Sequence, residues 1–333
     1  MIMGMGWLKA GQMLLPKSVN YKISARNYFT PRRALLYVPG DNIKKINKSF
    51  TLNADCIALD CEDGVAENKK ESARNTIRSF LENGKPKLTR DYDLGVRING
   101  FDTPHWEEDL RSCLNAPHLP DTILVPKVDT SETITLFAEH VNKLLPAGKR
   151  LNIIIYIESA KSFVNLVDIC RTAQNLSDNK KIEPVALVFG SDDFCANLGI
   201  TRTEDSNEVL YARQKLVLVA KAFNLQAIDM VYIKYKDLEG LKVQSEQGMR
   251  MGYTGKQVIH PGQVSVVQEA FLPTNQQIEW ATGLLESFEE HQSKGKGAFN
   301  YRDSMIDMPT MRQADNILKL AKLKNFNTCQ NSK

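Results

Sequence analysis

The chain has 333 residues, of which 42% are hydrophobic and 25% are charged, and its formal net charge at pH 7 is +4. A chain of this length and composition can bury one large core or two modest ones. Residues 1–33 hold six lysines and arginines, whereas the first acidic residue is Asp41. The rest of the chain therefore carries about −2, which argues against a protein that binds nucleic acid through a basic face.

The acid-free leader, residues 1–33, also contains interspersed Leu, Met, Tyr and Phe. Such a composition is typical of a presequence and predicts a protein of the mitochondrial matrix, with a basic arm as the alternative interpretation. We find no apolar run as long as a membrane span and expect no membrane partner. The six cysteines lack CxxC or Cys/His spacing, so we expect reduced thiols rather than a zinc site.

From Ala34 onward, short apolar runs alternate with stretches of helical spacing. Several runs, such as 153–155 and 185–189, are apolar at every position. This is typical of parallel strands with both faces covered, which need helical crossovers. Eight such units without a linker predict an α/β fold, a (β/α)₈ TIM barrel over residues 34–272, with an open doubly wound sheet as the alternative. The expected strands are 34–38, 56–60, 95–99, 122–127, 152–158, 185–189, 227–233 and 257–260.

Helix signals fall between these runs. Asp41 is a candidate N-cap for a helix through Phe50, and Thr130 is one for a helix with a regular apolar stripe. Helical spacing also covers residues 208–223. Beyond the last strand, helices near 264–271 and 278–288 and a glycine hinge at 295–297 predict a C-terminal helical extension over residues 273–333.

Charged residues close six of the apolar runs, and in a barrel these positions share the C-terminal face. Glu158 follows a strongly apolar run, where an unpaired carboxylate is costly and needs a cation. Asp193 supplies a second oxygen ligand one strand further on, and the two carboxylates suit Mg²⁺. Ion pairing or helix capping is the alternative role for each. Asp192 can equally serve as a cap.

Two basic features lie near the same face. The guanidinium of Arg97 suits bidentate capture of a substrate carboxylate, with Asp60, Glu62 and Asp63 as alternative structural partners. Lys44 and Lys48 are spaced i, i+4 and could hold phosphates or simply solvate a helix.

Six segments together resemble the successive motifs of the citrate lyase beta-subunit family, and the resemblance spans about residues 33–321. Any one of the motifs alone would be weak, but their order is specific. They are LYVPGD at 36–41, LDCEDGV at 59–65, GVRIN at 95–99, YIES at 156–159, FGSDDF at 189–194 and IHPGQV at 259–264.

The resemblance, strongest to the animal mitochondrial members, implies a Mg²⁺-dependent homotrimeric lyase that cleaves (3S)-citramalyl-CoA to acetyl-CoA and pyruvate. It further implies a malate synthase side activity and an acyl-CoA thioester as the small-molecule partner. Glu158 and Asp193 would bind the metal, Arg97 would anchor the substrate, and Asp307 would be the catalytic aspartate. Tyr37, Lys44, Lys48, Ile259 and His260 would line the path of the substrate or coenzyme A.

The implied chemistry needs a group that protonates the thioester enolate, and Asp307 lies between two apolar residues that would raise its pKa. An aspartate in an ordinary turn before Pro309 is the alternative. Two other classes of protein remain open. One is a Mg²⁺-dependent aldolase or enolpyruvate enzyme that acts on a free keto acid without coenzyme A. The other is a non-catalytic acyl-CoA-binding protein.

Overall fold

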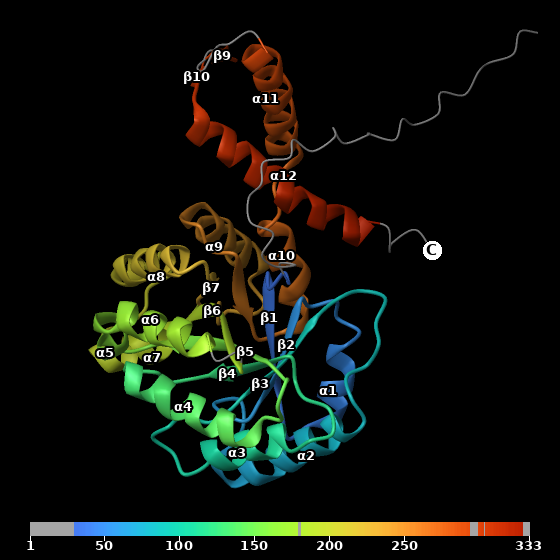
Figure 1. Cartoon of the computed structure of the whole chain (residues 1–333), viewed down its shortest axis with the longest axis vertical. Helices are drawn as coiled ribbons and strands as arrows, with labels where there is room; N and C mark the ends of the chain where they lie inside the picture. The colour runs from blue at the N-terminus through green and yellow to red at the C-terminus, as the bar shows by residue number, and fades with distance from the viewer. Residues whose placement is uncertain (1–29, 179–180, 294–298, 303, 329–333) are drawn as a thin grey trace, which may run out of the picture. The chain divides into compact units, whose positions relative to one another are not determined.

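A computed structural model describes residues 30–178, 181–293, 299–302 and 304–328 (Figure 1). Eight parallel strands close into a barrel in sequence order, and each strand is followed by one or more helices. This confirms the predicted (β/α)₈ barrel and excludes the open sheet. The strands are β1 (Ala34–Pro39), β2 (Cys56–Asp60), β3 (Asp93–Arg97), β4 (Thr122–Val125), β5 (Leu151–Ile157), β6 (Ile182–Phe189), β7 (Gln226–Asp229) and β8 (Gly255–Val258).

The barrel helices occupy the stretches with helical spacing. Short 3₁₀ turns at Glu67–Lys69, Asn207–Val209 and Pro261–Gln263 precede α2, α8 and α10. The helices are α1 (Ile43–Ser49), α2 (Lys70–Glu82), α3 (Trp106–Leu114), α4 (Ser131–Leu144), α5 (Ala160–Val164), α6 (Leu166–Ser177), α7 (Ser191–Leu198), α8 (Leu210–Ala222), α9 (Leu238–Met251) and α10 (Val264–Ala270).

Every expected strand is present, but several ends differ from the predictions. β7 ends at Asp229, four residues before the expected end, and β3 begins at Asp93 instead of Gly95. Thr130 is the N-cap of α4, as predicted. The prediction of Asp41 as an N-cap is wrong: Asn42 has the extended backbone of a cap, and its side chain accepts a hydrogen bond from the Lys45 N–H. Either residue type can cap, so sequence alone could not choose between neighbours.

The strands are buried on both faces, as their continuous apolar runs predict. One cluster fills the barrel interior and includes Leu35, Ala58, Ile154 and Tyr156. A larger cluster lies between the strands and the helices. Because both faces are covered, the chain can place charged groups only where strands begin or end, or where a partner is built in.

Arg32 and Arg33, which the charge pattern assigned to the leader, are buried parts of the barrel, only 3% and 4% exposed. The Arg32 Nε contacts the Asp93 carboxylate at 2.5 Å, and Arg33 binds both oxygens of Asp55 at 2.7 and 2.9 Å. The Arg33 carbonyl also accepts a hydrogen bond from the backbone of β8. The boundary of the barrel therefore lies before Arg32, earlier than the predicted boundary after residue 33.

The C-terminal segment has a hydrophobic cluster of its own. α11 (Asn275–Ser293) and α12 (Met308–Thr328) pack on each other, and the short strands β9 (Phe299–Tyr301) and β10 (Ser304–Ile306) pair between them. The cluster contains Ala281, Leu284, Phe288, Ile306, Met311 and Ala314. The expected glycine hinge at 295–297 and residues 1–29 lie outside the described residues.

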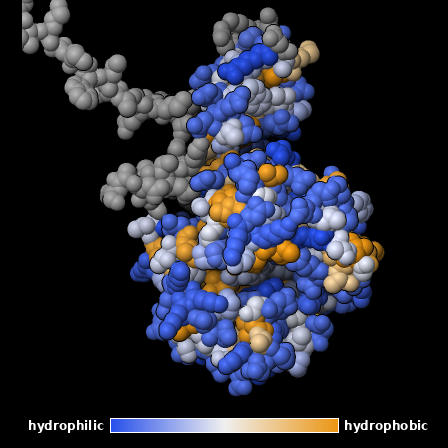
Figure 2. All heavy atoms as spheres, turned by 180° about the vertical axis from the view of Figure 1, so that it is seen from behind, coloured by the Kyte–Doolittle hydropathy of each residue, from blue (hydrophilic) through white to orange (hydrophobic). Residues whose placement is uncertain are grey.

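The surface drawn in Figure 2 is mostly hydrophilic, with apolar side chains in small separate groups. Within the described ranges, no helix is both long and apolar enough to cross a membrane.

We predict that a chain beginning at Ala34 is less stable than one beginning at Thr30, by at least about 3 kcal/mol. Removing Arg32 and Arg33 leaves the buried carboxylates of Asp93 and Asp55 without their guanidinium partners. Urea denaturation of the two purified chains measures the difference. Equal free energies of unfolding of the two chains would contradict a stabilising role of Arg32 and Arg33 in the barrel.

Candidate active site

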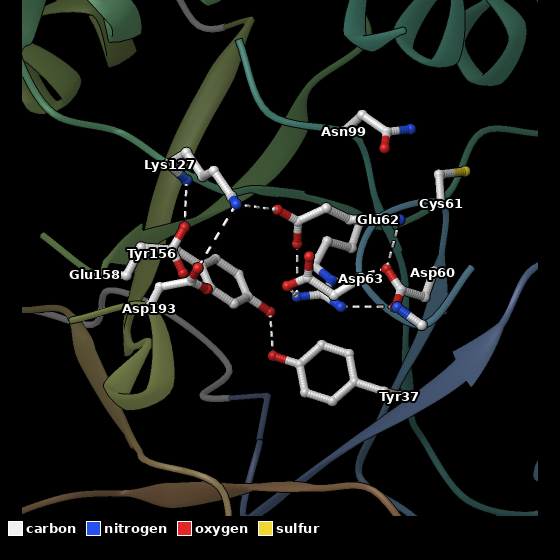
Figure 3. A network of polar contacts seen from close by, with 12 residues as sticks. Tyr37, Asp60, Cys61, Glu62, Asp63, Asn99, Lys127, Tyr156, Glu158 and Asp193 are labelled. Carbon is white, nitrogen blue, oxygen red and sulfur yellow. Dashed lines mark hydrogen bonds and ion pairs between the residues drawn. The ribbon is translucent and has the colours of Figure 1, made fainter. Parts of the chain in front are cut away.

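Charged side chains converge where the barrel strands end at their carboxyl side (Figure 3). Asp60 and Arg97 are the last residues of β2 and β3, and Glu158 directly follows β5. Lys127 follows β4 by two residues, and Asp193 lies in the first turn of α7 after β6. The structure thus brings together Arg97, Glu158 and Asp193, which the sequence predicted to share this face.

Arg97 is held in a fixed orientation by acidic neighbours. Its Nε and Nη2 atoms donate to the two oxygens of Asp60 at 2.7 and 2.6 Å, and Nη1 lies 2.7 Å from Glu62 Oε2. Asp60 also accepts from the backbone N–H groups of Glu62 and Gly64. Although burial acts to raise the pKa of Asp60, the Arg97 charge and these hydrogen bonds lower it below its ordinary value. Of the five N–H groups of a guanidinium, two are not taken up by Asp60 or Glu62, and Nη1 also lies 3.7 Å from Asp63 Oδ2.

An aromatic pair lies beneath Arg97. The guanidinium carbon lies 4.5 Å from the ring centre of Tyr37 and 5.9 Å from that of Tyr156. The Tyr37 and Tyr156 hydroxyls are 2.5 Å apart, and Tyr37 also donates to Gln257 Oε1 at 2.9 Å. The predicted substrate-lining residue Tyr37 thus has its hydroxyl engaged inside the barrel and offers its ring to Arg97, a cation–π arrangement.

Glu158 is 6% exposed, and its Oε1 accepts a hydrogen bond from the Lys127 backbone N–H at 2.5 Å. Burial, together with the charge of Asp193, raises the pKa of Glu158 to about 7. Gly190 is required beside it, because a Cβ there would lie 2.3 Å from Glu158 Oε2. This carboxylate is therefore tightly placed, and its partner is a backbone amide rather than a fixed cation.

Asp193 and Glu62 are two further acidic side chains that lie near Glu158. Burial raises the pKa of Asp193 above its ordinary value and that of Glu62 to about 8. The Lys127 ammonium lies between them, 3.6 Å from Asp193 Oδ1 and 3.8 Å from Glu62 Oε1. Asp192 is turned elsewhere and pairs with Arg202 at 2.8 Å. Of the two adjacent aspartates, Asp193 is the one that shares the site with Glu158.

The donor set fits a hard divalent cation. In the part of the chain that the structure describes, no group of three or more His, Cys, Asp or Glu side chains could hold a metal. Mg²⁺ commonly binds through one or two carboxylates and keeps several waters or substrate oxygens. Glu158 and Asp193 match that requirement, and a nearby cation would favour the charged form of both carboxylates.

The other predicted residues lie outside this cluster of contacts. Lys44 and Lys48 are exposed on α1, directly after β1. Ile259 and His260 follow β8 and are exposed. The His260 Nδ1 accepts from the Gly262 N–H, and its ring lies 4.8 Å from that of Tyr235. These positions leave the predicted binding roles untested.

Asp307 precedes α12 in the C-terminal segment. Its exposed carboxylate accepts hydrogen bonds from Thr310 N–H and Oγ1 at 3.2 and 2.9 Å, as a helix-capping residue does. These contacts are local to its own segment, so its catalytic role stays a prediction.

Sequence reasoning gave no role to Lys127, Tyr156 or Gln257. A usable signal existed for two of them: Lys127 closes an apolar run just as Glu158 does, and Tyr156 precedes Glu158 by two residues and so shares its strand face. Gln257 had no such signal, because its role depends on the hydrogen bond with Tyr37 on β1, the neighbouring strand in the closed barrel but far away in the sequence.

Comparison with known proteins agrees with this geometry. A relative from Mus musculus named citramalyl-CoA lyase, mitochondrial, is 45% identical over 94% of this chain and 93% of its own. The citrate lyase subunit beta of Leuconostoc mesenteroides subsp. cremoris is 30% identical over 87% of this chain and 93% of its own.

A solved structure of protein CitE from Mycobacterium tuberculosis, in complex with magnesium, acetoacetate and coenzyme A, superposes with a TM-score of 0.70. It is 26% identical and covers 88% of this chain and 98% of its own. The model of the family described as HpcH/HpaI aldolase/citrate lyase matches residues 33–261, which include all eight barrel strands. The chain therefore belongs to the HpcH/HpaI aldolase/citrate lyase family.

Proposed function

We propose that this chain is a Mg²⁺-dependent carbon–carbon lyase that cleaves (3S)-citramalyl-CoA to acetyl-CoA and pyruvate. The observation that carries the proposal is the placement of two carboxylates, the buried Glu158 and the partly exposed Asp193, at the same barrel mouth as the guanidinium of Arg97. The named activity of the Mus musculus relative and the magnesium and coenzyme A in the CitE complex support it.

Each group at the mouth has a task in this reaction. Glu158 and Asp193 would hold the ion, which when bound stabilises the oxygen where negative charge develops. The two uncommitted N–H groups of Arg97 would orient the substrate carboxylate, while Asp60 and the Tyr37 ring keep the guanidinium in place. Tyr37 is partly buried and Tyr156 is buried, and their rings would lower the local dielectric and so strengthen these electrostatic interactions.

In the cleavage, the substrate hydroxyl loses its proton and becomes the ketone of pyruvate, and the electron pair of the broken carbon–carbon bond passes to the thioester as an enolate, which must gain a proton to become acetyl-CoA. We assign that proton transfer to Asp307. Asp307 lies on a C-terminal segment that has its own hydrophobic cluster. We also propose that the chain forms a homotrimer in which this segment supplies Asp307 to the barrel mouth of a neighbouring subunit.

We propose a mitochondrial location, in the matrix. The acid-free leader and the names of the mammalian relatives support it. Because Arg32 and Arg33 belong to the barrel, a mature chain isolated from mitochondria should still contain both. Recovery of the protein only from the cytosol would contradict the proposal.

Asp193→Asn should lower kcat for citramalyl-CoA cleavage by about 100-fold or more, because it removes a charged ligand of the ion. Asp192→Asn is the matched control. Asp192 is adjacent but pairs with Arg202, so this variant should stay close to wild type. Steady-state assays with Mg²⁺ and with EDTA make the comparison. Full activity of the wild type in EDTA, or equal loss in both variants, would contradict the metal assignment.

Lys44→Ala combined with Lys48→Ala should raise KM for the thioester much more than it lowers kcat, since contacts to remote phosphates act mainly as uniform binding. Lys45→Ala removes an exposed charge from another face of α1 and serves as the control. Calorimetry with coenzyme A checks the binding directly. Unchanged binding in the double variant would mean that the pair only solvates the helix.

Asp307→Asn should abolish thioester turnover while sparing the binding of Mg²⁺ and coenzyme A. Asparagine also caps helices well, so the start of α12 should persist and only the proton carrier is lost. Asp315→Asn, further along α12, is the control and should stay active. An active Asp307→Asn enzyme would remove this residue from the mechanism.

A mixture of chains tests the shared site. Asp307→Asn and Glu158→Ala chains are each expected to be inactive, but allowed to exchange subunits they should regain part of the activity. The absence of recovery in verified mixed oligomers would place Asp307 at its own barrel.

A further inference from the structure

Lys127 has a backbone conformation that lysine rarely adopts. Its φ of 52° lies in the left-handed region, where the Cβ of a non-glycine residue is crowded. Strain of this kind persists only where the surroundings enforce it and is concentrated at functional sites. Here the conformation points the Lys127 N–H at Glu158 Oε1, 2.5 Å away.

The side chain of Lys127 is positioned as well. Its stem runs along Gly100, where an added Cβ would lie 3.1 Å from the Lys127 Cδ. The ammonium then reaches Asp193 at 3.6 Å and Glu62 at 3.8 Å, as the dashed lines in Figure 3 show. A single residue therefore contacts three carboxylates, one through its backbone and two through its charge.

The three neighbouring carboxylates need the positive charge of Lys127. Arg97 is already engaged with Asp60 and Glu62, so its contacts do not extend to Asp193 at ion-pair distance. Among the residues that the structure describes, the Lys127 ammonium is the cation found within ion-pair distance of Asp193. It is about one-third exposed on a flexible stem, whereas Arg97 is nearly buried.

We propose that Lys127 is a positioning residue that holds the place of the catalytic metal: its ammonium balances Asp193 in the metal-free enzyme and gives way to Mg²⁺. This inference rests on the proposed function, in which Asp193 and Glu158 bind the ion. The backbone N–H stays on Glu158 throughout, so the metal ligand remains aimed while the ammonium turns toward Glu62.

The physical basis is competition between two cations for one carboxylate. An ammonium and Mg²⁺ repel each other strongly when both lie within about 4–5 Å, even at the effective dielectric of a protein surface. Metal binding must therefore displace the ammonium from Asp193. The observed affinity of Glu158 and Asp193 for Mg²⁺ should therefore be lower than it would be without the ammonium.

The experiment is isothermal titration of metal-free full-length protein with MgCl₂, without substrate. Lys127→Met keeps the backbone N–H and much of the stem but removes the charge, so it should bind Mg²⁺ about tenfold more tightly than wild type. Lys127→Arg keeps a cation and should bind close to wild type. Lys161→Met removes an exposed charge from the first turn of α5, three residues after Glu158, and should also change little.

Unchanged or weaker Mg²⁺ binding by a folded Lys127→Met protein, while wild type binds, would overturn this inference and leave the proposed function standing. Lys127→Gln gives a second neutral side chain if the Met variant does not fold. Should neither wild type nor the neutral variants bind Mg²⁺, the inference and the metal-dependent function would both be wrong. Tighter binding by Lys161→Met to the same extent would attribute the effect to general charge and also overturn the inference.

Discussion

A carboxylate buried in an apolar barrel needs a positively charged or hydrogen-bonding partner. The kind of partner differs between the amino end of the strands, the barrel wall and the barrel mouth. At the amino end of the strands, Arg32 and Arg33 neutralise Asp93 and Asp55. In the wall of the barrel, Asp229 lies between Arg213 and Lys256, and all three are fully buried. These pairs are fixed, and breaking one would leave a buried charge uncompensated.

The carboxylates at the barrel mouth do not all have a fixed arginine partner. Asp60 has Arg97, and despite burial its pKa is lowered, as is that of Asp229 in the wall. Glu158 and Asp193 have a backbone amide and a partly exposed lysine instead, and burial raises the pKa of both. Asp60 and Asp229 are held by arginine, whereas Glu158 and Asp193 lack a guanidinium at hydrogen-bond distance and are available to a metal ion.

Much of this could be predicted from the sequence, because it depends on local pattern. Continuous apolar runs identify covered parallel strands, and the charged residues that close them identify Arg97, Glu158 and Asp193 at one face. What the sequence could not supply depends on partners far apart in the chain. The charge count assigned Arg32 and Arg33 to a basic leader. In the structure they pair with Asp93 and Asp55, which lie 61 and 22 residues further along the chain. Lys127 closes an apolar run and so was a visible candidate, but its contact with Glu158 depends on a left-handed backbone conformation that the local sequence did not predict.

We propose that the residues at the mouth of this barrel cleave a hydroxyacyl thioester of coenzyme A with the help of a divalent ion. Mass spectrometry of purified full-length protein incubated with Mg²⁺ and, separately, with citramalyl-CoA, malyl-CoA, citryl-CoA and free citramalate tests it most directly. We expect citramalyl-CoA to yield acetyl-CoA and pyruvate in equal amounts, while free citramalate persists. Cleavage of the free acid, or intact citramalyl-CoA after prolonged incubation, would contradict it.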